Sequence, residues 1–241
     1  MRKVWKPQVA IAKALAGAMT GLLAVAWTSA ASNAQEPKRG GTLVYAVLGD
    51  PPTIDCHAAT SFASMHYLSP HYSLLIKIDP TDPSKVAPDV AQSWTQSDDK
   101  LTYTFKLRPG VTFHDGSPLT SADVVASYTA VQTDPTVIGN RDFDNVASVT
   151  APDATTVVIT LTEPDINFLF TLTTPAGLVF SAGDTTDLKT AANGTGPFIF
   201  DSWKRKDSIK FTRNDAYWGD AASLAEVTFV YIPDFTAGVN A

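Results

Sequence analysis

The sequence contains a single cysteine, Cys56, among 241 residues. One thiol cannot form an internal disulfide bond, so the fold does not depend on one. Cys56 has no basic neighbour except His57, which favours a small half-buried residue over a reactive thiol. Neither a Gly-x-x-x-x-Gly-Lys-Ser loop nor a Gly-x-Gly-x-x-Gly fingerprint is present. The sequence therefore offers no loop for a nucleotide.

Long apolar runs are also lacking. The uncharged run at residues 14–27 is well below the ~20 apolar residues that span a bilayer. It follows a basic start and precedes the small residues 32–34, which is the layout of a secretory signal peptide. We expect residues 1–34 to be removed and the mature chain to begin at Gln35. No lipoprotein cysteine follows the run, so the mature protein is predicted to be soluble.

Positive charge is scarce in the predicted mature chain. The full sequence has 18 basic and 24 acidic residues, a formal net charge of −6. The signal segment holds four of the basic residues and no acidic one, which leaves 14 against 24 and a net charge of −10. Such a balance argues against nucleic acid and anionic membranes as partners. It fits a solvated periplasmic protein.

The most informative pattern lies at residues 101–124. Apolar side chains occupy every second position of 101–107, which is the period of a half-buried strand. Pro109-Gly110 ends this strand, and Asp115-Gly116 predicts a further turn after a short strand. Thr120, with Asp123 three residues later, predicts a helix N-cap with an acidic side chain in the first turn.

The rest of the chain predicts a mixed α+β fold that is rich in antiparallel pairs. Two β-hairpins are expected, one pairing residues 146–150 with 155–162 and one pairing 198–203 with 208–212. Single strands are expected at residues 42–47 and 227–231. Helices are expected over 61–78 with a break or kink at Pro70, over 120–132, and over 164–172.

Five groups of short motifs, in this order, resemble the signature of a known family. They are Gly40-Gly41-Thr42-Leu43 with Pro51-Pro52-Thr53-Ile54-Asp55, then Val86-Ala87-Pro88-Asp89-Val90-Ala91-Gln92-Ser93-Trp94, residues 101–124, Gly194-Thr195-Gly196-Pro197-Phe198, and Arg213-Asn214 with Tyr217-Trp218-Gly219. The family is that of the family 5 extracellular solute-binding proteins, which are peptide- and nickel-binding receptors of ABC importers. The motifs extend over essentially the whole predicted mature chain.

The resemblance implies a fold and a function. Family members have two lobes and are roughly twice as long, so residues 35–241 are expected to be the N-terminal lobe of a type II periplasmic binding protein-like fold, truncated before the second lobe. The ligand, a small molecule or an oligopeptide, would bind between the lobes without any chemistry or cofactor. The closed form would dock on a membrane permease, and the full-length protein would be a monomer.

Ligand contacts are expected where the loop after the first strand enters the next helix. Thr60, Ser61 and Phe62 are the candidates, because hydroxyl and N–H groups there bind carboxylates or carbonyls while Phe62 packs against the ligand. Thr60 or Ser61 acting only as a helix cap is the alternative, and the two roles can coexist.

Two further side-chain groups suggest other chemistry. His114 and Asp115 could belong to an exported hydrolase, but no Gly-x-Ser-x-Gly motif accompanies them, and a turn with His114 facing outward is the preferred interpretation. His57, His66 and His71 are nine and five residues apart, unlike the i, i+4 spacing of helical metal ligands, so no metal site is predicted.

Two surface predictions concern the second half of the chain. Residues 204–206 are basic and are expected to form a solvated hairpin turn rather than a binding patch. Val227, Phe229 and Tyr231 belong to the last predicted strand, and one face of it is expected to lack cover in a truncated lobe. Such a surface would promote association.

Overall fold

The structure is a computed structural model, and it describes residues 38–58, 64–65, 69–188 and 190–232. The described strands form two four-stranded sheets and one two-stranded sheet. Thr60, Ser61, Phe62 and His66 lie outside the described residues. No helix within the described ranges is long and apolar enough to cross a membrane.

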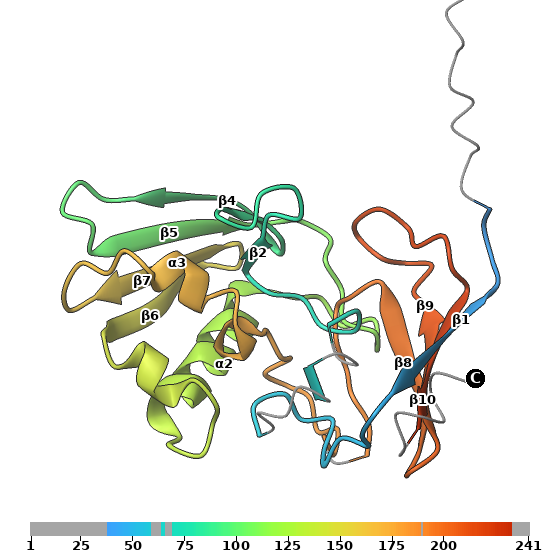
Figure 1. Cartoon of the computed structure of the whole chain (residues 1–241). Helices are drawn as coiled ribbons and strands as arrows, with labels where there is room; N and C mark the ends of the chain where they lie inside the picture. Colours follow the sequence, from blue (N-terminus) through green and yellow to red (C-terminus); the bar gives the residue numbers. More distant parts are fainter. Residues whose placement is uncertain (1–37, 59–63, 66–68, 189, 233–241) are drawn as a thin grey trace, which may run out of the picture. The chain divides into compact units, whose positions relative to one another are not determined.

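The first sheet is antiparallel throughout and has the order β4-β5-β7-β6 (Figure 1). Its strands are β4 (Ala91–Gln96), β5 (Thr102–Leu107), β7 (Thr156–Leu161) and β6 (Val146–Asp153). In β5, Phe105 is buried and Lys106 is exposed, as the alternation of residues 101–107 predicts. The predicted hairpin of β6 with β7 is confirmed as well.

Helix α2 (Ser121–Thr133) packs against this sheet and begins where the sequence indicates. Thr120 and Asp123 form a capping box, in which the Thr120 N–H donates to the Asp123 carboxylate at 2.7 Å. Because a capping box satisfies N–H groups that have no partner inside the helix, it fixes the first turn. Tyr128 lies on the buried face and its hydroxyl donates to the Gly177 carbonyl at 3.1 Å.

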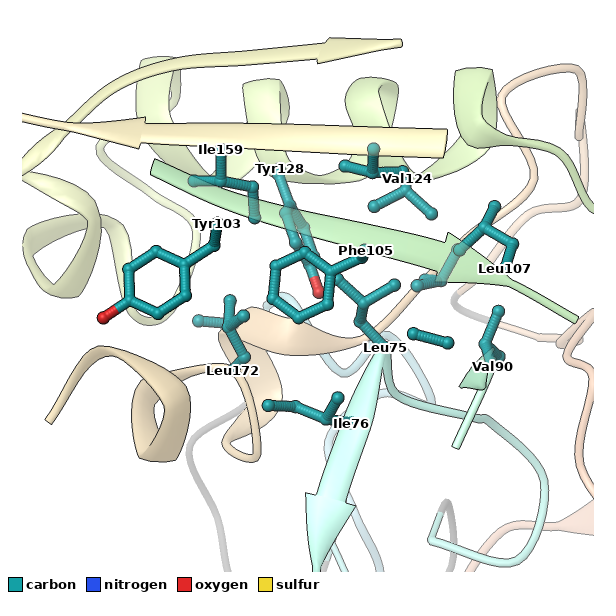
Figure 2. Packing of buried hydrophobic residues seen from close by; sticks show 14 of the residues in the cluster. Leu75, Ile76, Val90, Tyr103, Phe105, Leu107, Val124, Tyr128, Ile159 and Leu172 are labelled. Atoms are coloured by element: carbon teal, nitrogen blue, oxygen red, sulfur yellow. The ribbon is translucent and has the colours of Figure 1, made fainter. Parts of the chain in front are cut away.

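The sheet and helix enclose a first core, which we call the sheet–helix core (Figure 2). Short helical segments close its edges: the 3-10 helix η1 (Asn140–Phe143), α3 (Phe168–Thr171) and the 3-10 helix η2 (Pro175–Gly177). The helix predicted over 164–172 is confirmed only at residues 168–171, which form the short α3. Ten residues of this core, labelled in Figure 2, are Leu75, Ile76, Val90, Tyr103, Phe105, Leu107, Val124, Tyr128, Ile159 and Leu172.

The second four-stranded sheet has the order β1-β10-β9-β8 (Figure 1). Its strands are β1 (Thr42–Val47), β10 (Glu226–Tyr231), β9 (Ser208–Arg213) and β8 (Phe198–Lys204). Strand β1 is parallel to β10, and the other pairs are antiparallel. One face of this sheet builds a second core, the edge-sheet core, whose buried members are Ile54, Cys56, Tyr72, Leu178, Phe198, Ile209, Phe211, Val227, Phe229 and Tyr231.

The helix predicted over residues 61–78 is wrong in its described second half. Leu74 forms an isolated bridge with Leu178, and the two-stranded sheet pairs β2 (Ile76–Ile78) with β3 (Val86–Pro88). The apolar stretch after Pro70 is only eight residues long, a length that periodicity cannot assign to helix or strand, so its pairing partners decide.

The prediction that Val227, Phe229 and Tyr231 lack cover is also wrong. They are only 6%, 7% and 9% exposed, because this face of β10 packs in the edge-sheet core with Ile54, Tyr72 and Leu178. In this sheet the exposed large apolar side chains are instead on β1, where Val44 is 63% exposed, and just after it, where Leu48 is 65% exposed.

Candidate functional site

The segment that leads to the predicted ligand contacts is held by a local network of hydrogen bonds. The Asp55 N–H donates to the Thr53 hydroxyl at 3.0 Å, and the His57 N–H donates to the Asp55 carboxylate at 2.9 Å. Short polar side chains stabilise turns in this way by accepting bonds from N–H groups two residues later. Residues 53–57 therefore have a defined conformation immediately before Thr60, Ser61 and Phe62.

The β8–β9 hairpin turn clamps the loop that follows β1. Asp50 accepts a hydrogen bond from the Trp203 indole N–H at 2.8 Å. The Arg205 guanidinium donates to the carbonyls of Pro51 and Pro52 at 3.0 and 3.1 Å and lies 3.6 Å from the centre of the Trp203 ring. The predicted hairpin turn is confirmed, and its arginine in addition positions the loop that enters the candidate site.

Two cavities adjoin the segment at residues 55–58. The first has a volume of about 330 Å³ and its lining includes Cys56, Met65, Tyr72, Asp89 and Pro197. The second has a volume of about 320 Å³ and its lining includes Asp55, His57, Ser127, Phe180 and Asp184. Both volumes are sufficient for a small ligand or one or two amino-acid side chains.

The first cavity combines one buried carboxylate with an unpaired hydroxyl. Asp89 is 6% exposed and accepts hydrogen bonds from the Leu74 N–H at 2.9 Å and the Lys77 ammonium at 3.2 Å. Burial raises the pKa of Asp89, and these two partners oppose that effect. The Tyr72 hydroxyl is buried without a hydrogen-bond partner. Burial also raises the pKa of the Cys56 thiol, which keeps it protonated and unreactive.

The second cavity is acidic and holds a neutral imidazole. Asp55 and Asp184 both line it, and the ring of His57 packs on Phe180 at 4.3 Å between centroids. Burial lowers the pKa of His57 to about 4, against the opposing effect of the Asp55 charge. At neutral pH this cavity therefore presents carboxylates without a compensating imidazolium.

His114 and Asp115 are not arranged as a catalytic pair. The Asp115 carboxylate accepts hydrogen bonds from the Ser117 N–H at 2.8 Å and from the Asn193 side chain at 3.0 Å. His114 accepts the Gly194 N–H at Nδ1, at 3.2 Å, and its Nε2 donates to the Gly196 carbonyl at 3.0 Å. The expectation that His114 faces outward is wrong, because both ring nitrogens bond to this neighbouring loop. No nitrogen is left to act as a general base.

The histidines considered for a metal site are also separated by the fold. His57 lies in the second cavity, whereas His71 packs on His114 and Phe211. Within the part of the chain that the structure describes, no three His, Cys, Asp or Glu side chains are placed to hold a metal ion.

A family model and individual relatives both identify this chain with one protein family. Residues 85–241 match the bacterial extracellular solute-binding proteins, family 5 Middle. The oligopeptide-binding protein AppA of Bacillus subtilis is 31% identical over 224 residues, which are 88% of this chain and 41% of AppA. The glutathione-binding protein GsiB of Escherichia coli O1:K1 is 32% identical over 181 residues, 73% of this chain and 35% of GsiB.

A solved structure supports the same assignment. The periplasmic binding protein DppA from Helicobacter pylori, in complex with the peptide STSA, superimposes with a TM-score of 0.78 at 26% identity, covering 85% of this chain and 45% of DppA. The fold is thus that of the part of a periplasmic binding protein that this chain covers. The chain belongs to family 5 of the bacterial extracellular solute-binding proteins, and it spans less than half the length of these relatives.

Proposed function

We propose that residues 35–241 are the N-terminal lobe of a periplasmic receptor that delivers peptides to the membrane permease of an ABC importer. The observation that carries this proposal is the likeness to the peptide complex of DppA over 85% of the chain. In such a receptor, a ligand that binds better to the closed state shifts the lobes toward closure, and no bond is made or broken. The full-length receptor would act as a monomer.

The ligand would lie along the segment that contains Thr60, Ser61 and Phe62. The support is positional: the described residues just before it line two cavities, and the clamp formed by Asp50 and Arg205 fixes the loop from which it starts. The exported hydrolase, which would use His114 and Asp115, has no support in the geometry of these two side chains or in the family.

Phe62→Ala is expected to weaken peptide binding without a loss of stability. We would titrate the tetrapeptide Ser-Thr-Ser-Ala into the isotope-labelled chain and follow amide NMR shifts, which detect weak binding. The variant should need at least about 10-fold more peptide for half-saturation, because an aromatic contact is removed. This change corresponds to a loss of about 1.4 kcal/mol in binding free energy. Its Tm without peptide should stay within about 2 °C.

Phe170→Ala is the control for this titration, because Phe170 is 37% exposed and lines neither cavity. It should bind the peptide like the wild type. A large fall in the Tm of Phe62→Ala with unchanged affinity would place Phe62 in the core and refute its contact with the ligand.

Export is a separate proposal that rests on the sequence. We propose that residues 1–34 are a cleaved signal peptide and that the protein functions in the periplasm. N-terminal sequencing of the exported protein should read from Gln35. Recovery of a protein that retains Met1 in the membrane fraction would overturn this proposal.

A further inference from the structure

Two imidazole rings, His71 buried and His114 half-buried, pack against each other at an interplanar angle of 60° between the two cores. The ring centroids of His71 and His114 are 4.5 Å apart. His114 follows Phe113, which belongs to the sheet–helix core, and His71 precedes Tyr72, which belongs to the edge-sheet core. The pair therefore lies where residues of one core adjoin residues of the other.

A single loop, residues 194–198, holds both rings. His114 bonds to this loop through both ring nitrogens, to Gly194 and Gly196 as described above. His71 Nδ1 lies 3.1 Å from the Phe198 carbonyl, to which it donates. Main-chain bonds add to these contacts, since the Gly196 N–H donates to the His71 carbonyl at 2.8 Å.

Glycine is required where this loop approaches His71. A Cβ atom on Gly194 would lie 2.2 Å from the His71 carbonyl oxygen, and one on Gly196 would lie 2.6 Å from the same atom. Both separations are shorter than van der Waals contact allows. The Gly-Thr-Gly-Pro-Phe motif thus has a physical role here: it lets the loop close on the two histidines.

The surroundings of both rings favour the neutral form, through hydrogen bonding at His114 and through burial at His71. His114 Nδ1 accepts the Gly194 N–H, so a proton on this nitrogen would remove the bond. His71 Nε2 is buried, so a charge on this ring would lose its hydration, and this burial outweighs the backbone hydrogen bonds to Phe198 and Ala192 that favour the protonated ring. Two positive rings at 4.5 Å would in addition repel each other.

Few other titratable groups act on the pair. Tyr72 packs edge-on against His71, with 4.8 Å between ring centroids, and Asp115 is next to His114 with its carboxylate bonded to Ser117 and Asn193. Burial, followed by the His114 charge, lowers the pKa of His71 to about 3. Burial also lowers the pKa of His114, and the Gly196 carbonyl and the Asp115 charge oppose this shift.

We propose that His71 and His114 form an acid-sensitive latch that closes the loop 194–198 while both rings are neutral and releases it when they take up protons. In the open loop each histidine would titrate near its ordinary pKa of about 6.5, so the open form binds protons more tightly. Closure is therefore fully stable above about pH 6.5 and weakens as the pH falls below that value.

Release of the latch would alter the first cavity. Pro197 belongs to the loop, and Tyr72 packs on His71; both line that cavity. Acid would therefore change the shape of a cavity beside the candidate ligand segment without first unfolding the sheet–helix core.

Amide hydrogen exchange of Gly194 and Gly196 tests the latch in the whole chain. Their protection factors, corrected for the intrinsic pH dependence of exchange, should fall by about 8-fold to about 60-fold from pH 6 to pH 5, because opening lets both rings take up protons with an open-state pKa of about 6.5. Amides of β5 should keep their protection. In His71→Asn, whose amide can still donate to the Phe198 carbonyl, the fall should be about 8-fold smaller than in the wild type, because the contribution of the His71 ring is lost.

His57→Asn is the matched control. It removes another, half-buried imidazole, one that packs on Phe180, and it should retain the pH dependence of the wild type. Equal pH dependence in His71→Asn and the wild type would overturn the proposal. If His71→Asn does not fold, the wild type alone decides: protection of Gly194 and Gly196 that is independent of pH from 6 to 5 would also overturn it.

Discussion

Phe105→Ala is expected to lower the free energy of unfolding by about 3–5 kcal/mol. Phe105 is fully buried at the centre of β5, which has β4 on one side and β7 on the other. Its ring lies 6.3 Å from Trp94 and 6.5 Å from Tyr103, measured between centroids. Truncation would remove apolar contacts and leave a cavity that the strands on both sides prevent from collapsing.

Urea unfolding followed by tryptophan fluorescence measures this loss. Phe170→Ala is again the control, since a partly exposed phenylalanine on α3 should cost less than about 1 kcal/mol. A loss below about 1.5 kcal/mol for Phe105→Ala would mean that the sheet–helix core does not depend on this side chain.

Residues 35–241 are expected to self-associate through β1, and Val44→Lys is expected to make them monomeric. Strand β1 pairs only with β10, so its outer edge is unpaired among the described strands. Leu43, Val44 and Tyr45 are 43%, 63% and 49% exposed. An apolar edge strand favours pairing with another chain, and a lysine at the edge opposes it.

Light scattering after size-exclusion chromatography measures this change. The wild type should elute above the monomer mass and Val44→Lys at it. Thr95→Lys, on the edge strand β4 of the other sheet, is the control and should associate like the wild type. A wild-type chain that is monodisperse and monomeric would contradict the prediction.

Most of the secondary structure follows from local sequence. Strand β5 is predictable because alternation and the Pro109-Gly110 turn lie within ten residues, and α2 because Thr120 and Asp123 mark its start. The hairpins β6–β7 and β8–β9 are predictable for the same reason: both strands and the turn between them are adjacent in the chain.

The errors concern residues whose partners are distant in sequence. Ile76 is in a strand because it pairs with Pro88, and Val227 is covered because it packs in one core with Ile54, which precedes it by more than 170 residues. Periodicity reports which side of a segment is apolar, but the neighbouring segment that covers this side is decided by tertiary packing.

The candidate site is predictable only in part. The motifs place the ligand segment after β1, but spacing along the chain gives no sign that His71 lies on His114, 43 residues later, or that Arg205 reaches Pro51. The expectation that His114 faces outward rests on the Asp115-Gly116 turn alone. The loop that covers His114 comes about 80 residues later in the chain.

Titration of the wild-type chain with Ser-Thr-Ser-Ala tests the receptor assignment most directly. We expect saturable amide shifts in residues 55–58 and in the linings of the two cavities, with the peptide recovered intact. Cleavage of the peptide, or no shift in these residues at millimolar peptide while the chain is folded, would contradict it.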